Sequence, residues 1–296
     1  METKTKKKYG ILVASIILIL AAGLLLGVTQ KHSADYRKAV SLEENGQFGQ
    51  AYTLYHKAGR YKDSPQRMEA LLTRHPEAAL AGAKPGDLVS FGRYEQDGNE
   101  GNGPEPVQWY VLDQVDGRSL LLSRTCLACM GYHSSDDDIT WEECALRAWL
   151  NGAFLNQAFS KQEQGVIALT KNENPDEDRH GTRGGRDTED RVFLLSEMEA
   201  QVYFSSEESR DLMGAAESSQ LAIDQGIFQA EPNDLNVRTS PWWLRSPGTY
   251  QNSAVFVEND GTTNSNGAIA GNNCYCGVRP AVWIETEQGL KALSDS

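Results

Sequence analysis

The sequence Val107-Gln-Trp-Tyr-Val-Leu-Asp-Gln-Val-Asp-Gly-Arg-Ser-Leu-Leu-Leu-Ser123 decides the fold class of the main part of this 296-residue chain. It holds two short strand-like runs, 107–112 and 119–123, on either side of Asp116-Gly117. An Asp-Gly pair between two apolar runs is typical of a tight turn, so the stretch predicts an antiparallel hairpin. A similar run at 88–92 precedes it and predicts one more strand.

The residues after this hairpin change to a helical pattern. Apolar side chains recur at helical spacing over 141–168. The spacings Ser160 to Glu163 and Ser196 to Glu199 are those of capping boxes, which predict a helix start at each.

Strands and long polar loops complete this part of the chain. Strands are predicted at 191–195, 242–244, 254–257 and 278–284, and polar loops cover 171–190 and 205–239. Because strands and helices occur without βαβ alternation, we expect an α+β domain. We place it at 86–284, with a C-terminal tail at 285–296.

The N-terminus predicts a membrane anchor. Residues 11–28 contain no charge, and the stretch 9–28 would span about 30 Å as a helix, the thickness of a bilayer's hydrocarbon core. Four lysines within residues 1–8 precede it, which retains that tail in the cytoplasm. We therefore predict a single-pass plasma-membrane protein, with the bilayer as partner of 9–28 and the rest of the chain outside the cell.

A cleaved secretory signal is the alternative interpretation of the same segment. The apolar region of a signal is normally about 7–15 residues long and ends in a small-x-small cleavage site. The apolar run is longer here, and Gly27-Val-Thr-Gln30 is a poor cleavage site. These two features favour the uncleaved anchor.

The chain after the anchor is strongly acidic. The whole chain carries a formal charge of −13, and residues 1–31 are net positive, so the excess of carboxylates lies in the remainder. Such a domain repels nucleic acid and anionic lipid and suits cations, basic partners or neutral glycans. Solubility alone would also account for the charge.

Residues 34–74 predict a small helical unit. Gly46 and Gly59 separate three helical stretches, the last of which begins near Asp63-Ser-Pro65. The segment Gly46 to Ala51 resembles the turn of a tetratricopeptide helical pair, and 59–64 resembles the junction beside such repeats. Since solenoids need about three repeats, we interpret this unit as a short stalk.

Six motifs, taken in order, resemble a family of bacterial extracytoplasmic domains of unknown function. They are Phe91-Gly-Arg-Tyr-Glu95, Trp109-Tyr-Val-Leu112, Leu146-Arg-Ala-Trp-Leu-Asn151, Val192-Phe-Leu-Leu-Ser196, Trp242-Trp-Leu-Arg-Ser-Pro-Gly248 and Gly277-Val-Arg-Pro-Ala-Val-Trp-Ile284. The last motif also resembles the end of the C-type-lectin-like fold, as in formylglycine-generating enzymes and the variable binding proteins of diversity-generating retroelements. The resemblance implies that fold and no single activity.

Four side chains are candidates for ligand binding. Trp242 and Trp243 would face opposite sides of a strand, so one could pack in the core while the other offers a flat surface to a sugar ring or a peptide. Arg245 and Arg279 could bind a carboxylate of the ligand. In the alternative, the aromatic side chains belong to the core and the arginines pair with internal acids.

Five residues are candidates for a calcium site. Glu231-Pro-Asn233 matches the calcium-and-sugar tripeptide of C-type lectins, and Glu258-Asn259-Asp260 could add further oxygen ligands. Calcium is accordingly the candidate cofactor. The alternative is that both stretches are ordinary loops and turns.

The five cysteines are Cys126, Cys129, Cys144, Cys274 and Cys276. Outside the membrane they would form one or two structural disulfides and leave an odd thiol. All except Cys144 could instead form a four-thiolate zinc site. A formylglycine-generating enzyme needs two copper-binding cysteines near its end, and Cys274 and Cys276 lack that spacing.

We therefore predict a non-catalytic binding module for a glycan, a peptide or a protein. The alternatives are a modifying enzyme that depends on a metal or on cysteine, and a structural component of the cell envelope. His133 and His180 both lie in polar loops, so the sequence does not support a histidine-dependent hydrolase.

Overall fold

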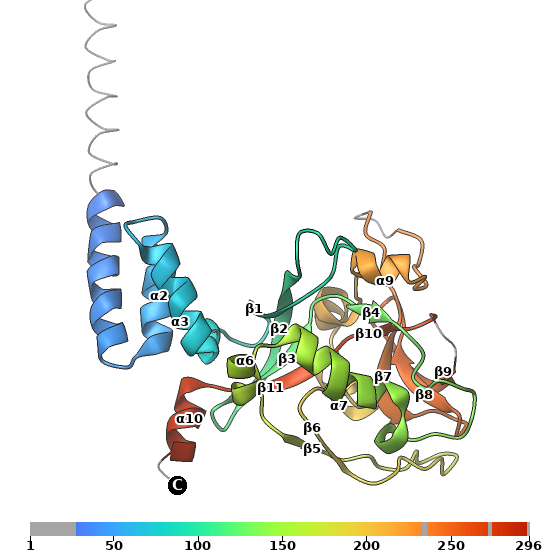
Figure 1. Ribbon diagram of the computed structural model, residues 1–296. Coiled ribbons are helices and arrows are strands. Elements are labelled where there is room, and N and C mark those ends of the chain that lie inside the picture. The colour runs from blue at the N-terminus through green and yellow to red at the C-terminus, as the bar shows by residue number, and fades with distance from the viewer. Residues whose placement is uncertain (1–27, 233–235, 272–273, 295–296) are drawn as a thin grey trace, which may run out of the picture. The chain divides into compact units, whose positions relative to one another are not determined.

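The computed structural model describes residues 28–232, 236–271 and 274–294. The chain divides into two compact units, Met1–Ala81 and Gly82–Ser296 (Figure 1), and each is described here by itself. The division lies within the Ala/Gly/Pro-rich junction between the helical stretches and the first strand. The predicted anchor lies outside the described residues except for Val28, and no helix of the described part is both long and apolar enough to span a bilayer.

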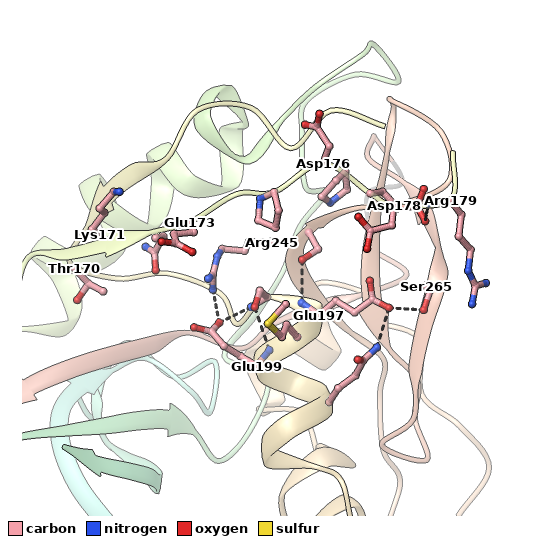
Figure 2. A pocket seen from close by; sticks show the side chains of 18 of the residues that line it. Thr170, Lys171, Glu173, Asp176, Asp178, Arg179, Glu197, Glu199, Arg245 and Ser265 are labelled. Atoms are coloured by element: carbon pink, nitrogen blue, oxygen red, sulfur yellow. Dashed lines mark hydrogen bonds and ion pairs between the residues drawn. The ribbon is translucent and has the colours of Figure 1, made fainter. Parts of the chain in front are cut away.

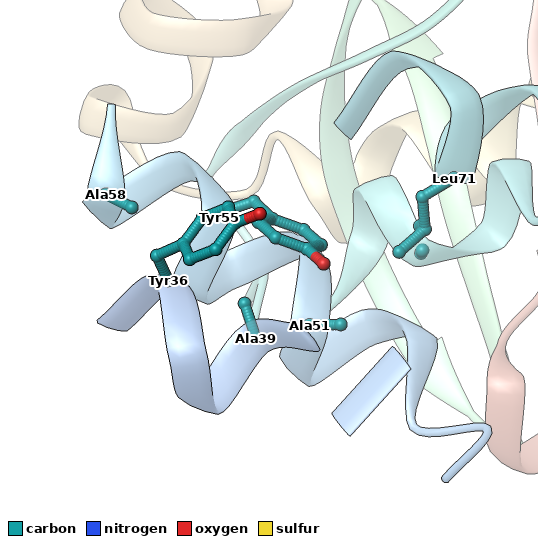
Figure 3. Close-up of a cluster of buried hydrophobic side chains, with 7 residues drawn as sticks. Tyr36, Ala39, Ala51, Tyr55, Ala58 and Leu71 are labelled. Carbon is teal, nitrogen blue, oxygen red and sulfur yellow. The ribbon is translucent and has the colours of Figure 1, made fainter. Parts of the chain in front are cut away.

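The first unit contains the three helices that the sequence predicts. Residues 28–44 are helical, and they are followed by α2 (Phe48–Ala58), α3 (Ser64–Arg74) and a 3₁₀ turn, η1 (Pro76–Leu80). Pro65 occupies the first turn of α3, where its missing N–H costs nothing. Alanine, tyrosine and leucine side chains form the core of the unit (Figure 3): Tyr36, Ala39, Ala51, Tyr55, Ala58, Leu71 and Ala78.

A single carboxylate connects these three helices. Glu43, in the first helix, accepts hydrogen bonds from the Tyr55 hydroxyl at 2.6 Å and from Arg74 at 2.9 Å. Arg67 donates to the same side chain at 3.2 Å. Because α2 supplies Tyr55 and α3 supplies both arginines, Glu43 fixes the position of one helix relative to the other two.

The second unit contains a four-stranded sheet in the order β1-β2-β3-β11. Its strands are β1 (Leu88–Tyr94), β2 (Glu105–Val115), β3 (Arg118–Ser123) and β11 (Ala281–Glu285). All neighbours are antiparallel. The hairpin predicted at Asp116-Gly117 is confirmed, and both residues have left-handed backbones, with φ of 50° and 75°.

A five-stranded sheet has the order β4-β10-β7-β8-β9. Its strands are β4 (Ala128–Cys129), β10 (Gly277–Val278), β7 (Trp242–Pro247), β8 (Ser253–Val257) and β9 (Thr263–Ile269). One pair, β10 with β7, is parallel, and the others are antiparallel. A separate ladder joins β5 (Thr170–Asn172) to β6 (Thr188–Asp190).

The helices of this unit are short. They are η2 (Trp141–Glu143), α4 (Ala145–Trp149), the π-helical η3 (Leu150–Phe154), α5 (Leu155–Ala158), α6 (Lys161–Val166), α7 (Glu197–Tyr203), α8 (Glu207–Ser209), η4 (Arg210–Gly214), α9 (Gln220–Asp224) and α10 (Glu287–Ser294). Both predicted capping boxes are present, at the starts of α6 and α7. The predicted α+β class is confirmed.

The strand predicted at 191–195 is wrong. Within that segment only Phe193 forms a β-bridge, with Ala281. The backbone amides of Arg191 and Val192 instead donate to the Asn151 side chain, at 2.8 and 3.2 Å. The amide of Asn151 in turn donates to the carbonyl of Val192 at 2.8 Å. One side chain thus takes the place of a neighbouring strand.

Candidate ligand-binding cleft

A cavity of about 620 Å³ opens in the second unit (Figure 2). Five separate parts of the chain line it: β5 with the loop after it, the start of α7, β7, β9 and β11. This volume falls in the usual range for a small-ligand site, roughly 300–1,000 Å³. The cavity is therefore the candidate functional site.

Hydrogen bonds join the start of α7 to two strands of the larger sheet. The backbone amide of Glu197 donates to the Ser246 hydroxyl in β7 at 2.9 Å. The Glu197 carboxylate accepts from the Ser265 hydroxyl in β9 and from the Gln201 amide at 3.1 Å (Figure 2). These contacts hold the α7 side of the cleft against the β-sheet side.

Arg245 is the most buried charge in the cleft, with a side-chain exposure of 6%. Its Nη1 donates to the Leu194 carbonyl at 2.8 Å and to the Glu199 carboxylate at 2.5 Å. Its Nε is buried and has no hydrogen-bond partner in the structure. Since buried donors in proteins are nearly always paired, this N–H is a candidate contact for a ligand acceptor.

Carboxylates dominate the wall of the cleft. Six of its lining side chains are acidic and three are basic: Glu173, Asp176, Glu177, Asp178, Glu197 and Glu199 against Lys171, Arg179 and Arg245. The arrangement favours a ligand that carries a cationic group.

The acidic loop has a defined backbone. Glu177 accepts hydrogen bonds from the amides of His180 and Arg179, at 2.6 and 3.0 Å, and these bonds lower the pKa of its carboxyl. Asp176 accepts from the amide of Gly184 at 3.0 Å. A side chain at Gly184 would put its Cβ 2.2 Å from the Asn174 carbonyl oxygen, so this crossing of the loop needs glycine.

Apolar side chains also contribute to the cleft. Met198 in α7 is 70% exposed, and Trp283 in β11 is partly exposed. Pro175 and Pro247 line the same cavity. A ligand that fits all of these side chains has an apolar part beside its cationic group.

Trp242 and Trp243 do not form a binding surface, which corrects one of the two interpretations given for them. Both side chains are 0% exposed. The indole N–H of Trp242 donates to the Gly214 carbonyl at 2.9 Å, and that of Trp243 donates to the Met130 carbonyl at 3.1 Å. Both therefore belong to the core, with their polar atoms satisfied.

Arg279 is not accessible to a ligand either, which corrects its prediction as a ligand contact. It is 0% exposed, and it donates to the carbonyls of Ser123 at 2.7 Å and Met213 at 2.5 Å. Its guanidinium lies 4.9 Å from the centre of the Trp242 ring. Burial lowers the pKa of Arg279 to about 10. Arg279 therefore organises backbone carbonyls, whereas Arg245 does pair with an internal acid.

Three of the five predicted calcium ligands interact with other side chains or with backbone amides. Glu231 faces Arg238 at 3.7 Å, Glu258 accepts from the Asn264 amide at 2.7 Å, and Asp260 accepts from the Thr262 amide at 2.9 Å. Asn259 lies in the turn between β8 and β9, and Asn233 is outside the described residues. In the part of the chain that the structure describes, Glu231, Glu258 and Asp260 do not gather within reach of one ion.

Another group of carboxylates is present in the described residues, and no sequence motif indicates it. Carboxylate oxygens of Glu95, Asp97 and Glu105 lie within 4.8 Å of one another. The backbone amide of Gln96 donates to Glu105 at 2.8 Å, and that of Asn99 donates to Asp97 at 2.8 Å. These carboxylates thus bind the amides of their own loop.

The five cysteines are present as thiols, so the expected disulfides are not formed here. Cys144 lies at the start of α4 and accepts from the Arg147 amide at 3.4 Å. Among the described residues, no three cysteine sulfurs lie within 4.8 Å of one another, so the predicted four-thiolate zinc geometry is not preformed.

The sequence predicts only two features of the cleft, Arg245 and the start of α7. Arg245 was a candidate residue, and the capping box marks the start of α7. The acidic segment 173–178 reads only as a polar loop in the sequence, because nothing local shows that it faces Arg245.

Comparison with known proteins places the chain in a family. No curated protein and no solved structure matches it. A family model described as "Domain of unknown function (DUF6273)" matches residues 116–286, which include every residue that lines the cleft. Since this match covers more than half of the 296 residues, the chain belongs to the DUF6273 family.

Proposed function

We propose that this protein is a binding module whose ligand is a basic peptide segment held in the cleft. The observation that carries the proposal is the cavity itself: five parts of the chain converge on about 620 Å³ lined by six carboxylates and one buried arginine. Such convergence of distant segments on a few placed polar groups is typical of ligand sites.

The lining suggests a role for each part of the ligand. A lysine or arginine side chain would lie against Glu173 and Asp178, the acids of the loop after β5. A main-chain carbonyl would accept from Nε of Arg245 once the side chains that cover this atom move aside. An apolar side chain would lie on Met198. A peptide supplies all three groups, whereas a neutral glycan supplies no cation.

The proposed role is binding without catalysis. The cysteines lie outside the lining of the cleft, so the alternative of a cysteine-dependent enzyme would need a second site. We also propose that the α+β unit has the C-type-lectin-like fold, and that 9–28 anchors it outside the cell. The support for these two points is the order of the six motifs and the apolar N-terminal segment.

Binding of labelled peptides to the full-length chain in mild detergent tests the proposal. The probe is a pool of hexapeptides that combine Lys with Leu or Phe, with Glu-for-Lys peptides and neutral oligosaccharides as separate arms. We expect binding by the Lys pool only, and weakening with rising salt because the charges that attract it are screened.

Two acid-to-amide variants sharpen this test. The double variant E173Q/D178N should weaken binding of the Lys pool about tenfold, equal to about 1.4 kcal/mol. The control E207Q/E208Q removes two carboxylates from α8, which does not line the cleft, and should leave binding unchanged. Equal effects of the two variants, or retention of oligosaccharides instead, would contradict the proposal.

A further inference from the structure

Two cysteines that are far apart in the sequence lie together at one end of the larger sheet. Cys129 ends β4, and its antiparallel partner across the ladder is Gly277 of β10. Cys274 lies three residues before Gly277, so the pairing of β10 with β4 brings it to the Cys129 end of the ladder. Figure 1 shows β4 and β10 side by side, with α9 next to them.

Gln225 binds both cysteines. Its side-chain oxygen accepts from the backbone amide of Cys129 at 2.7 Å, and its main-chain oxygen accepts from the Cys274 thiol at 3.0 Å. The Cys274 carbonyl accepts from the Phe228 amide at 3.1 Å, which fixes the backbone of this residue as well. Burial and, after it, the neighbouring Cys274 thiol raise the pKa of Cys129.

We propose that Cys129 and Cys274 form a disulfide bond when the protein meets an external disulfide of the glutathione type. The two thiols together lose two protons and two electrons, and one S–S bond forms between them. The external disulfide accepts both electrons and both protons, and it leaves as two thiols. This inference does not depend on the ligand proposed for the cleft.

Exposure indicates the order of the two exchange steps. Cys274 is partly exposed, so its thiolate attacks the external disulfide first and releases one thiol. Cys129 is buried, and it then attacks the Cys274 sulfur of the mixed disulfide and releases the second thiol. Burial raises the pKa of Cys129 and lowers its thiolate fraction, so its attack depends on its position beside the Cys274 sulfur.

The other three cysteines are expected to stay reduced. Cys126 and Cys276 are 0% exposed, and burial raises the pKa of Cys126 to about 11. Cys144 lies in a different part of the unit, and burial raises its pKa to about 12. A buried thiol does not meet an external disulfide, and among the buried cysteines Cys129 is the one that shares Gln225 with the partly exposed Cys274. Oxidation should therefore be selective for the pair Cys129 and Cys274.

The test maps the thiols of the full-length chain after incubation with oxidised glutathione. Free thiols are alkylated in denaturant, and the peptides are then identified by mass spectrometry without reduction. We expect one cross-linked pair, Cys129 with Cys274, and alkylation of the remaining three of the five cysteines. Alkylation of all five, or a cross-link between any other two, would overturn the proposal.

Single substitutions provide the matched controls. Cys129→Ser and Cys274→Ser should each abolish the cross-link and leave all four remaining thiols open to alkylation. Cys144→Ser should keep the cross-link, because serine also caps a helix and Cys144 is the first cap of α4. If either test variant fails to fold, the map of the unsubstituted chain still decides the question.

Discussion

Arg147 donates from its Nε to Asp190 at 2.6 Å, and the carboxylate that it meets is completely buried. Asp190 also accepts from the indole of Trp141 at 3.0 Å, from the Asn172 amide at 3.0 Å and from the Thr188 hydroxyl at 2.7 Å. One charge thus ties helix α4 to strands β5 and β6, which flank the acidic loop of the cleft.

Replacing Asp190 should therefore destabilise the second unit. The change Asp190→Asn keeps the shape but leaves the Arg147 charge without its partner, and we expect the free energy of unfolding to fall by about 3 kcal/mol. Denaturant unfolding followed by tryptophan fluorescence measures it. Asp187→Asn, which removes an exposed ion pair with Lys171, should cost far less because solvent screens that pair. Equal losses would contradict this role of Asp190.

The second prediction concerns Arg279. The change Arg279→Met preserves much of the side-chain volume but removes the donors that reach the carbonyls of Ser123 and Met213. Buried carbonyls without a partner are costly, so the free energy of unfolding should fall by about 2–4 kcal/mol. Arg238→Met serves as the control because Arg238 is largely exposed. A stable Arg279→Met protein that had lost ligand binding would restore Arg279 as a ligand contact.

The third prediction is a pH dependence of the helical unit. Burial alone would raise the pKa of Glu43, but hydrogen bonds from Tyr55, Arg74 and Arg67 outweigh it and lower the pKa below the ordinary 4.5. The folded unit therefore binds this proton less readily than the unfolded chain does. The stabilisation that ionised Glu43 contributes is complete above pH 4.5. It is lost as the pH falls through the pKa that Glu43 has in the folded unit.

Hydrogen exchange of peptides from 36–74 measures this effect at two pH values. We expect faster exchange, corrected for intrinsic rates, at pH 3 than at pH 6, because protonation of Glu43 removes its stabilisation. In Glu43→Gln the protection should be lower at pH 6 and should change less between the two conditions. If Glu43→Gln shows the same difference in exchange between pH 3 and pH 6 as the unsubstituted chain, a group other than Glu43 causes the pH dependence.

The sequence predicted those features that depend on neighbouring residues. The Asp116-Gly117 turn and the capping boxes at Ser160 and Ser196 depend on residues that are at most three positions apart in the sequence. The strand predicted at 191–195 does not form because amides of this segment bond to Asn151, about 40 residues away. The cleft was missed for the same reason, since the loop after β5 and Arg245 meet only in the folded chain.

The fourth prediction compares the two capping boxes. Glu199 and Glu163 each accept a backbone amide of their own cap at 2.7 Å, from Ser196 and Ser160. Glu199 alone also pairs with a buried arginine, Arg245. Glutamine serves in a capping box as well as glutamate does, so a Glu→Gln change isolates the charge from the cap.

Glu199→Gln should therefore cost more than Glu163→Gln. In the first variant the Arg245 guanidinium stays buried without its counter-charge, and because Glu199 itself is 32% exposed we expect a loss of about 2 kcal/mol. The second variant keeps its cap and loses only the long 3.2 Å hydrogen bond from the Gly92 amide, so it should lose about 1 kcal/mol. Paired denaturant curves measure both. Equal losses would mean that the cap, and not the charge beneath the cleft, accounts for the role of Glu199.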